Sequence, residues 1–284
     1  MADVVVLTVS FVTGISVLAL LSLGLAVVFT TRGIINLAHG EFVMMGAFTT
    51  VTLTRSGVPF VIALLVAAAL LAVFGWVLEV TLVRRLDGRP TDCMLATWGV
   101  SLIVTQVAVL LFGTTSEGLS IPLGSIQVGA AYTVGVYNLV LIAAAVVSIV
   151  VLALVLRRTR TGLFIRAAAQ SEIDARTLGV DTRRVRTIAF TSAAAFTGFA
   201  GGLLAPFLGV SPTMGATFIA KAFMTVMVGG ANAVVGTAAA SFALGGTDNI
   251  LSTWQSPLVG TLALLLIAVV IVRFMPRGLT GGRR

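Results

Sequence analysis

Charged residues and cysteine are scarce in this chain of 284 residues. Asp, Glu, Lys and Arg make up only 10% of it, well below the roughly 25% that is typical of a soluble domain. Hydrophobic residues make up 58%, and the mean hydropathy is +1.12. The single cysteine, Cys93, excludes an internal disulfide pair and a cysteine-rich metal cluster. This composition excludes an ordinary water-soluble fold.

Motifs for catalysis and for nucleotide binding are also missing. No G-x-x-x-x-G-K-[ST] loop occurs, and the only lysine, Lys221, lies in an apolar run, so the chain cannot hold ATP phosphates in a P-loop. One histidine and one cysteine provide no H-E-x-x-H zinc site, and no G-x-S-x-G turn is present. We therefore expect no catalytic residue, no metal and no cofactor in this chain, and any ATPase must be a separate chain.

Long apolar segments dominate what is present. They occupy roughly residues 5–30, 34–53, 58–83, 93–112, 133–156, 187–209, 217–235, 236–252 and 257–275. Several approach or exceed the roughly 18 to 20 residues that a helix needs to cross a bilayer. The sequence predicts an all-α polytopic membrane protein, a single domain over residues 1–284 with eight or nine transmembrane helices. Two or three segments are short, polar or interrupted by glycine, which indicates broken or re-entrant helices. The stretches NLAHGEFVMMGAF and PTMGATFIAKAFMTV are weakly similar, which is a weak indication of an inverted repeat.

Basic residues lie in short stretches between the apolar segments, so the net charge of +8 indicates membrane topology rather than nucleic-acid binding. Three arginine-bearing regions are predicted to face the cytoplasm: the loop with Arg84, Arg85 and Arg89; residues 157–186; and the C-terminus with Arg273, Arg277, Arg283 and Arg284. The segment 113–131 has no Lys or Arg and carries Glu117, so it should face outward. The N-terminus lacks the basic start of a cleaved signal peptide and is predicted to be a retained first helix.

The predicted cytoplasmic loop, residues 157–186, contains RTRTGLFIRAAAQSEIDARTLGVDTRRVR. Helix formers predict one short helix from Phe164 to Leu178, with Glu172 four residues before Arg176 in the favourable order for an ion pair. Gly179 should end it, and Asp181 or Thr182 should cap the next helix. The loop is either a solvated segment that obeys the topology rule or a docking helix for a partner.

Asn36, His39 and Glu41 lie in INLAHGEFVMMGAF, just after Gly33. Polar side chains inside a membrane are costly and usually face a bundle interior or a water-filled path. We expect a broken or re-entrant helix to begin here and to line a cavity, because irregular backbone at membrane depth is tolerated only there. The alternative is that Asn36 and His39 form hydrogen bonds that hold helices together.

A second polar group lies in TDCMLATWGVSLIVTQ. Thr97, Ser101 and Thr105 recur every four residues, with Gln106 beside them, which predicts a ladder of hydroxyl groups on one helix face. These hydroxyls either bind a small polar solute or donate to their own helix carbonyls. Three alternatives remain open for the Lys221 ammonium. It pairs with a carboxylate such as Glu41 or Asp248, it contacts a substrate carboxylate, or it extends toward an interface.

The blocks RAAAQSEIDARTLGVDTRRVRTIAF, GFAGGLLAPFLGVSP, AFMTVMVGGANAVVGT, INLAHGEFVMMGAF and RFMPRGL together resemble the membrane subunits of ABC importers of the branched-chain amino acid and urea type. ATWG, Ala96 to Gly99, is closer to the urea members, whereas KAF around Lys221 is closer to the branched-chain amino acid permeases. The resemblance implies a permease subunit that takes up urea or a short amide, or alternatively branched-chain amino acids. A stand-alone channel or secondary carrier is the more distant alternative.

The resemblance also implies partners and site residues. Residues 157–186 would contain the coupling helix, which contacts the ATP-binding subunits through Arg166, Glu172, Arg176 and Gly179. The substrate pathway would include Asn36, His39, Glu41, Thr97, Trp98, Ser101, Gln106 and Lys221. ATP and Mg would bind the partner ATPase subunits, a second homologous permease would complete the pathway, and a periplasmic or extracellular solute-binding protein would deliver the substrate. The expected location is the bacterial inner membrane, with the C-terminus in the cytoplasm and no nucleic-acid partner.

Overall fold

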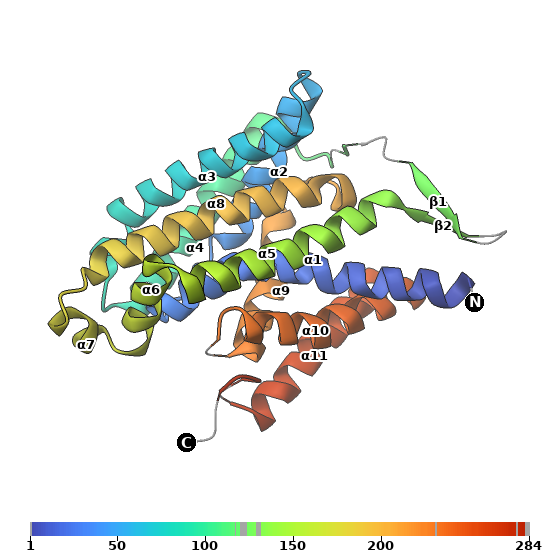
Figure 1. The fold of residues 1–284 in the computed structure, drawn as a ribbon. Helices are drawn as coiled ribbons and strands as arrows, with labels where there is room; N and C mark the ends of the chain where they lie inside the picture. The colour runs from blue at the N-terminus through green and yellow to red at the C-terminus, as the bar shows by residue number, and fades with distance from the viewer. Residues whose placement is uncertain are drawn as a thin grey trace. The chain divides into compact units, whose positions relative to one another are not determined.

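The computed structural model describes residues 2–116, 118–119, 124–128, 132–230, 232–276 and 278–281. Glu117, Arg277, Arg283 and Arg284, which entered the topology prediction, lie outside the described residues. The predicted all-α class is confirmed (Figure 1). The helices are α1 (Ala2–Arg32), α2 (His39–Arg55), α3 (Phe60–Thr81), the 3-10 helix η1 (Val83–Leu86), α4 (Pro90–Phe112), α5 (Val136–Arg158), α6 (Arg160–Gln170), α7 (Glu172–Thr177), α8 (Thr182–Leu208), α9 (Met214–Gly229), α10 (Val235–Trp254) and α11 (Pro257–Phe274).

Each predicted apolar segment corresponds to one helix of the described chain. Six helices, α1, α3, α4, α5, α8 and α11, are long and apolar enough to cross a membrane. Helices α2 and α9 have only 17 and 16 residues, and α10 carries several polar residues in its second half. The prediction that some segments are shorter or more polar than a simple span is confirmed, and the number of crossings stays a prediction.

A small β-hairpin is the main feature that the helical pattern did not predict. Strands β1 (Ser125–Val128) and β2 (Tyr132–Gly135) pair antiparallel, with Ile126 opposite Val134. Strand β1 alternates Ser125 and Gln127 with the β-branched Ile126 and Val128, and β2 begins with Tyr132, Thr133 and Val134, residue types that are enriched in strands. The hairpin lies in the region expected to be an outward loop and the start of an apolar segment, so α5 begins only at Val136.

The prediction of one helix from Phe164 to Leu178 is wrong, because the chain breaks at Ser171. Ser171 has extended dihedral angles (φ −155°, ψ 114°), and its hydroxyl accepts the backbone N–H of Asp174 at 3.2 Å. A serine at this position caps the helix that follows it, so α6 and α7 are separate. Gly179 ends the segment with φ +82°, and Asp181 caps α8 by accepting the N–H of Arg184 at 3.0 Å, as expected.

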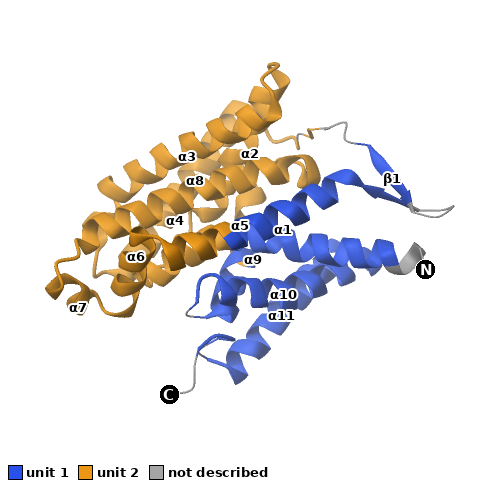
Figure 2. Cartoon of the chain, viewed as in Figure 1, with its two compact units in different colours: residues 1–22, 120–150, 221–284 blue, residues 23–119, 151–220 orange. Residues whose placement is uncertain are grey.

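The chain divides into two compact units (Figure 2). Unit 1 comprises residues 1–22, 120–150 and 221–284, and its core includes Leu18, Leu244 and Leu264. Unit 2 comprises residues 23–119 and 151–220. In unit 2, helices α2, α3 and α8 form the core, where the ring of Phe42 meets Phe74 and Phe190 edge to face, with centroid distances of 5.5 and 6.4 Å.

Glycines bring α2 and α8 into backbone contact within unit 2. A Cβ added at Gly46 would overlap the carbonyl oxygen of Gly198, and one added at Gly201 would overlap the carbonyl oxygen of Val43. Small residues permit this close approach, which replaces the hydrophobic effect as a source of helix association inside lipid. These glycines therefore hold α2 in place, and α2 begins at the predicted site residue His39.

The substitution Gly46→Ala should lower the free energy of unfolding by about 1–3 kcal/mol, because the backbone of α8 cannot move aside for a methyl group as a flexible side chain could. The matched control is Gly99→Ala, since a Cβ at that helical glycine meets open space. The control should be neutral or stabilising by up to about 1 kcal/mol. Thermal unfolding midpoints of the two purified variants in the same detergent would test this, and equal midpoints would contradict it.

Candidate functional site

The break between α1 and α2 is the first polar feature of unit 2. Helix α1 ends at Arg32, Gly33 adopts φ +64°, and the chain stays non-helical until α2 begins at His39. The Asn36 side chain accepts the N–H of Ala38 at 3.1 Å, and the N–H of Leu37 donates to the Thr97 hydroxyl at 3.2 Å. The predicted helix break after Gly33 is confirmed. The side-chain amide oxygen of Asn36 therefore supports the local turn.

The Glu41 carboxylate lies at the other end of this break. It is buried, and its Oε1 accepts the Ser101 hydroxyl at 2.8 Å, while the Thr105 hydroxyl also interacts with it. A Cβ at Gly215 would overlap the carboxylate, so the first turn of α9 lies directly against Glu41. A helix N-terminus favours a negative charge. Two hydroxyls and a helix end thus surround one buried carboxylate.

The hydroxyl ladder of α4 faces the α1–α2 break. Thr97 accepts from the break and donates to its own helix at the carbonyl of Met94 (3.0 Å), and Ser101 binds Glu41. The structure thus brings Asn36, Glu41, Thr97 and Ser101 together. Trp98 and Gln106 are exposed and do not join them.

His39 is buried at the start of α2. A Cβ added at Gly24 would come within 3.3 Å of the His39 ring carbon Cε1 and would overlap the Thr197 hydroxyl oxygen. The imidazole and the Thr197 hydroxyl of α8 therefore both lie against α1 at Gly24. This placement fits the helix-to-helix role that was the alternative for His39.

Lys221 belongs to unit 1, where its Nζ lies 2.7 Å from Oδ2 of Asp248. Of the two partners considered for Lys221, the structure selects Asp248. The pair joins α9 to α10 within an apolar part of the chain.

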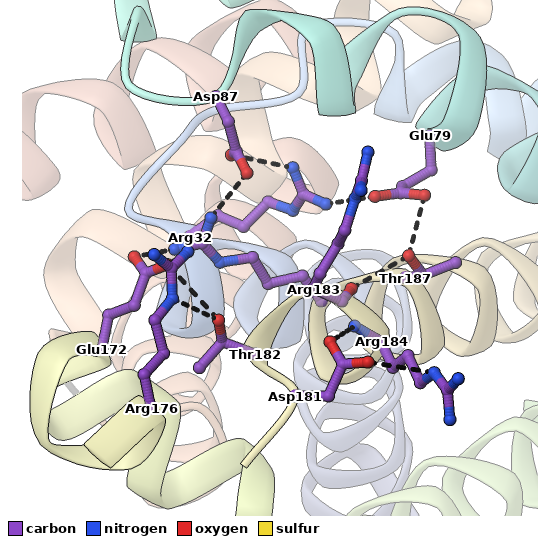
Figure 3. Close-up of polar contacts among 11 residues, drawn as sticks. Arg32, Glu79, Asp87, Glu172, Arg176, Asp181, Thr182, Arg183, Arg184 and Thr187 are labelled. Atoms are coloured by element: carbon purple, nitrogen blue, oxygen red, sulfur yellow. Dashed lines mark hydrogen bonds and ion pairs between the residues drawn. The ribbon is translucent and has the colours of Figure 1, made fainter. Parts of the chain in front are cut away.

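A group of six charged residues, the arginine–carboxylate cluster, links the predicted coupling segment to other elements of unit 2 (Figure 3). Its members are Arg32, Glu79, Asp87, Glu172, Arg176 and Arg186. Arg32 contacts Glu79 at 2.5 Å and Asp87 at 3.3 Å, and Arg186 contacts Asp87 at 2.7 Å. Glu172 pairs with Arg186 and, at 2.5 Å, with Arg176. The ion pairs form one continuous chain from α7 to the end of α1.

Burial changes along this chain of ion pairs. The side chains of Arg32 and Glu79 are 2% and 0% exposed, whereas those of Asp87 and Glu172 are about one-third exposed. Glu79 also accepts the Thr187 hydroxyl at 2.9 Å. A buried charge that loses its partner is strongly destabilising. The Arg32–Glu79 pair is therefore the fixed end of the cluster, and the part near α7 is the accessible end.

A pocket of about 570 Å³ opens beside the cluster. It is lined by Arg32, Gly33, Ile34, Asp87, Gly88, Pro90, Glu172, Ile173, Arg176 and Arg186. The pocket connects α7 with the start of the α1–α2 break, and both belong to unit 2. It also brings residues of two predicted cytoplasmic loops together.

At the far end of α2, Arg55 donates to the carbonyl of Gly118 at 3.0 Å, in the segment predicted to face outward.

The predicted docking residues differ in their exposure. Arg166, Arg176 and Gly179 are exposed, but Glu172 is engaged by the internal ion pairs. Ile173 and Leu178 are not among the residues predicted from sequence, although they are 76% and 81% exposed. The sequence feature that could have identified Ile173 and Leu178 is the presence of two large apolar residues in an otherwise polar segment. Arg32 and Glu79 were not predicted as site residues either, although Glu79 is visible in the sequence as a carboxylate within an apolar run.

Comparisons with known proteins agree over nearly the whole chain. The family "Branched-chain amino acid transport system / permease component" matches residues 7–275. The chain is 27% identical to the high-affinity branched-chain amino acid transport system permease protein LivH of Escherichia coli K12, over 94% of this chain and 92% of that protein. It is 26% identical to the probable LivH of Methanocaldococcus jannaschii, over 94% and 89%. It is 28% identical to the probable ABC transporter permease protein y4mJ of Sinorhizobium fredii, over 90% and 78%. No solved structure matches.

Proposed function

Because the chain belongs to the family of branched-chain amino acid transport permease components, we propose that it forms half of the membrane pathway of an importer for branched-chain amino acids. It is a permease subunit of the ABC type and a multi-pass membrane protein, not an enzyme. The observation that carries the substrate proposal is the match over residues 7–275 together with the LivH relatives. None of these relatives is named as a urea permease, so the urea indication from ATWG is not supported.

The coupling segment, α6 and α7, is proposed to receive the ATP-binding subunits. Helix α6 buries Gly162, Ile165 and Ala168 on one face, which fixes it to unit 2. Helix α7 exposes Ile173, and Leu178, which directly follows its last residue, is exposed as well. Large apolar side chains exposed on a polar segment mark an interaction surface. The partner subunits would bind ATP and Mg, and their closure would push α7.

The arginine–carboxylate cluster is proposed to pass this movement into the membrane. A shift of α7 displaces Glu172, which pulls on Arg186 and through Asp87 on Arg32. Arg32 is the last residue of α1 and precedes Gly33, where the positive φ allows the chain to bend. Packed, ion-paired elements respond by switching between discrete arrangements rather than by deforming gradually. The break would therefore act as a hinge for α2.

The polar residues at the break are proposed to border the substrate pathway. Asn36, Glu41, Thr97 and Ser101 gather there, whereas His39 packs against α1 and is not part of this group. Irregular backbone at membrane depth is expected beside a cavity. Trp98 and Gln106 are not part of this proposal, since they are exposed. A homologous permease would provide the other half of the pathway, and a solute-binding protein would deliver the amino acid outside.

Uptake into proteoliposomes tests the proposal. The chain, its partner permease, the ATPase subunits and the solute-binding protein should together accumulate leucine only with ATP inside. Leucine uptake should exceed urea uptake by about tenfold or more, since specificity reflects the difference in binding free energy between two solutes. Accumulation of urea instead of leucine would overturn the substrate. Uptake by this chain alone without ATP would show a channel or carrier.

A further inference from the structure

An isolated ion pair lies inside the apolar part of unit 1. Lys221, the only lysine of the chain, lies about halfway along α9, and Asp248 lies in the second half of α10. Their side chains are 17% and 19% exposed, so the pair is largely buried but still reachable. Ionisable residues within membrane helices are costly, and they commonly mark pathways for substrates or ions.

The pair retains unused hydrogen-bonding capacity. A lysine ammonium has three donors, and Oδ2 of Asp248 takes one of them at 2.7 Å. The other carboxylate oxygen, Oδ1, is buried and has no hydrogen-bond partner among the described residues. The hydroxyls of Thr225 and Thr247 donate to carbonyls of their own helices, at 2.8 and 2.9 Å. A buried acceptor without a donor costs free energy, so Oδ1 is suited to receive an additional donor.

Close helix packing fixes the position of Asp248. A Cβ added at Gly14 would overlap the side chain of Asn249, so α10 lies directly against α1 within unit 1. A Cβ at Gly260 would come within 2.5 Å of the Asp248 carbonyl oxygen, so α11 contacts α10 on another side. A carboxylate on such a rigid element is pre-organised, which reduces the entropic cost of binding a ligand.

We propose that Lys221 and Asp248 form a subsite for the two charged groups of a free α-amino acid. The ammonium of Lys221 donates to the substrate carboxylate, and the substrate ammonium donates to Oδ1 of Asp248. Both protein charges keep an opposite charge nearby when the substrate enters between them, which offsets the cost of separating the pair. A neutral amide such as urea supplies no charge and cannot replace the ion pair. This inference rests on the proposed function. It makes the α-ammonium and α-carboxylate groups of the amino acid the features that the subsite recognises.

The double variant K221M/D248L tests the subsite against a purely structural ion pair. Replacing both charges with apolar residues of similar volume leaves no unpaired charge, so assembly and the unfolding midpoint should stay at wild-type values. Leucine uptake in the complete system should nevertheless fall about tenfold or more. The matched control is R89Q/D92N, which removes the exposed pair between Arg89 and Asp92. A double variant that takes up leucine like the wild type would overturn the subsite.

A measurement on the wild-type complex avoids the need for any variant to fold. Since Lys221 is the only lysine of this chain, its modification by a small amine-reactive reagent can be followed by mass spectrometry of one peptide. Leucine should slow the modification, whereas urea at the same concentration should not. Equal rates with leucine and urea would overturn the inference. A wild-type complex that fails to take up leucine at all would instead overturn the proposed function.

Discussion

Replacing Arg32 with methionine is expected to lower the free energy of unfolding by about 3–5 kcal/mol, because the substitution leaves Glu79 as an uncompensated buried charge. The carboxylate of Glu79 is fully buried, and its remaining partner is the Thr187 hydroxyl, which cannot neutralise the charge. The measurement is the unfolding midpoint of the purified subunit in denaturant, together with the amount of protein recovered from membranes.

Two further variants identify the cause. In Arg89→Met an exposed partner of Asp92 is removed, and the expected loss is below about 1 kcal/mol. In the double variant R32M/E79M neither charge remains, and Thr187 still donates to the carbonyl of Arg183. The double variant should regain most of the lost stability. If R32M were no less stable than R89M, the buried ion pair would not anchor the cluster.

The sequence predicts much of this fold because membrane helices are encoded by local composition. The apolar segments, the break after Gly33, the Glu172–Arg176 pair and the Asp181 cap are all short-range features, and the structure shows each of them. Ser171 is the informative exception. A serine within a run of helix formers costs little free energy, whether it lies inside a helix or caps one. Helix propensity alone therefore could not show that Ser171 caps a new helix.

The functional clusters depend on distant residues, which a single sequence does not reveal. Glu79 meets an arginine 47 positions earlier and a threonine 108 positions later. The α4 hydroxyls were recognised as a ladder, but their partner, the segment from Leu37 to Glu41, could not be inferred. The exposure of Ile173 and Leu178 is likewise a property of how α7 packs. Local polarity identified candidate positions, and tertiary packing decided their partners.

Placing aspartate at both Ile173 and Leu178 is expected to abolish ATP-driven uptake while the permease itself remains folded. Both side chains are largely exposed in the subunit, so aspartate at these positions stays hydrated before assembly. In the proposed complex each aspartate would be buried against an ATPase subunit without a partner, which costs several kcal/mol. At about 1.4 kcal/mol for each tenfold change in affinity, co-purification of the ATPase should fall about a hundredfold or more.

The matched control is Thr177→Asp, which adds a carboxylate at an exposed polar position of the same short helix. Glu172→Arg is a less selective probe, because Glu172 already pairs with Arg176 and Arg186 inside the subunit. The I173D/L178D variant should keep the wild-type unfolding midpoint and lose both ATPase binding and leucine uptake, whereas T177D should keep all three. If I173D/L178D retained the ATPase subunits and transported leucine normally, α7 would not be the docking surface, and the ion pairs leading from it to Gly33 would have no force to transmit.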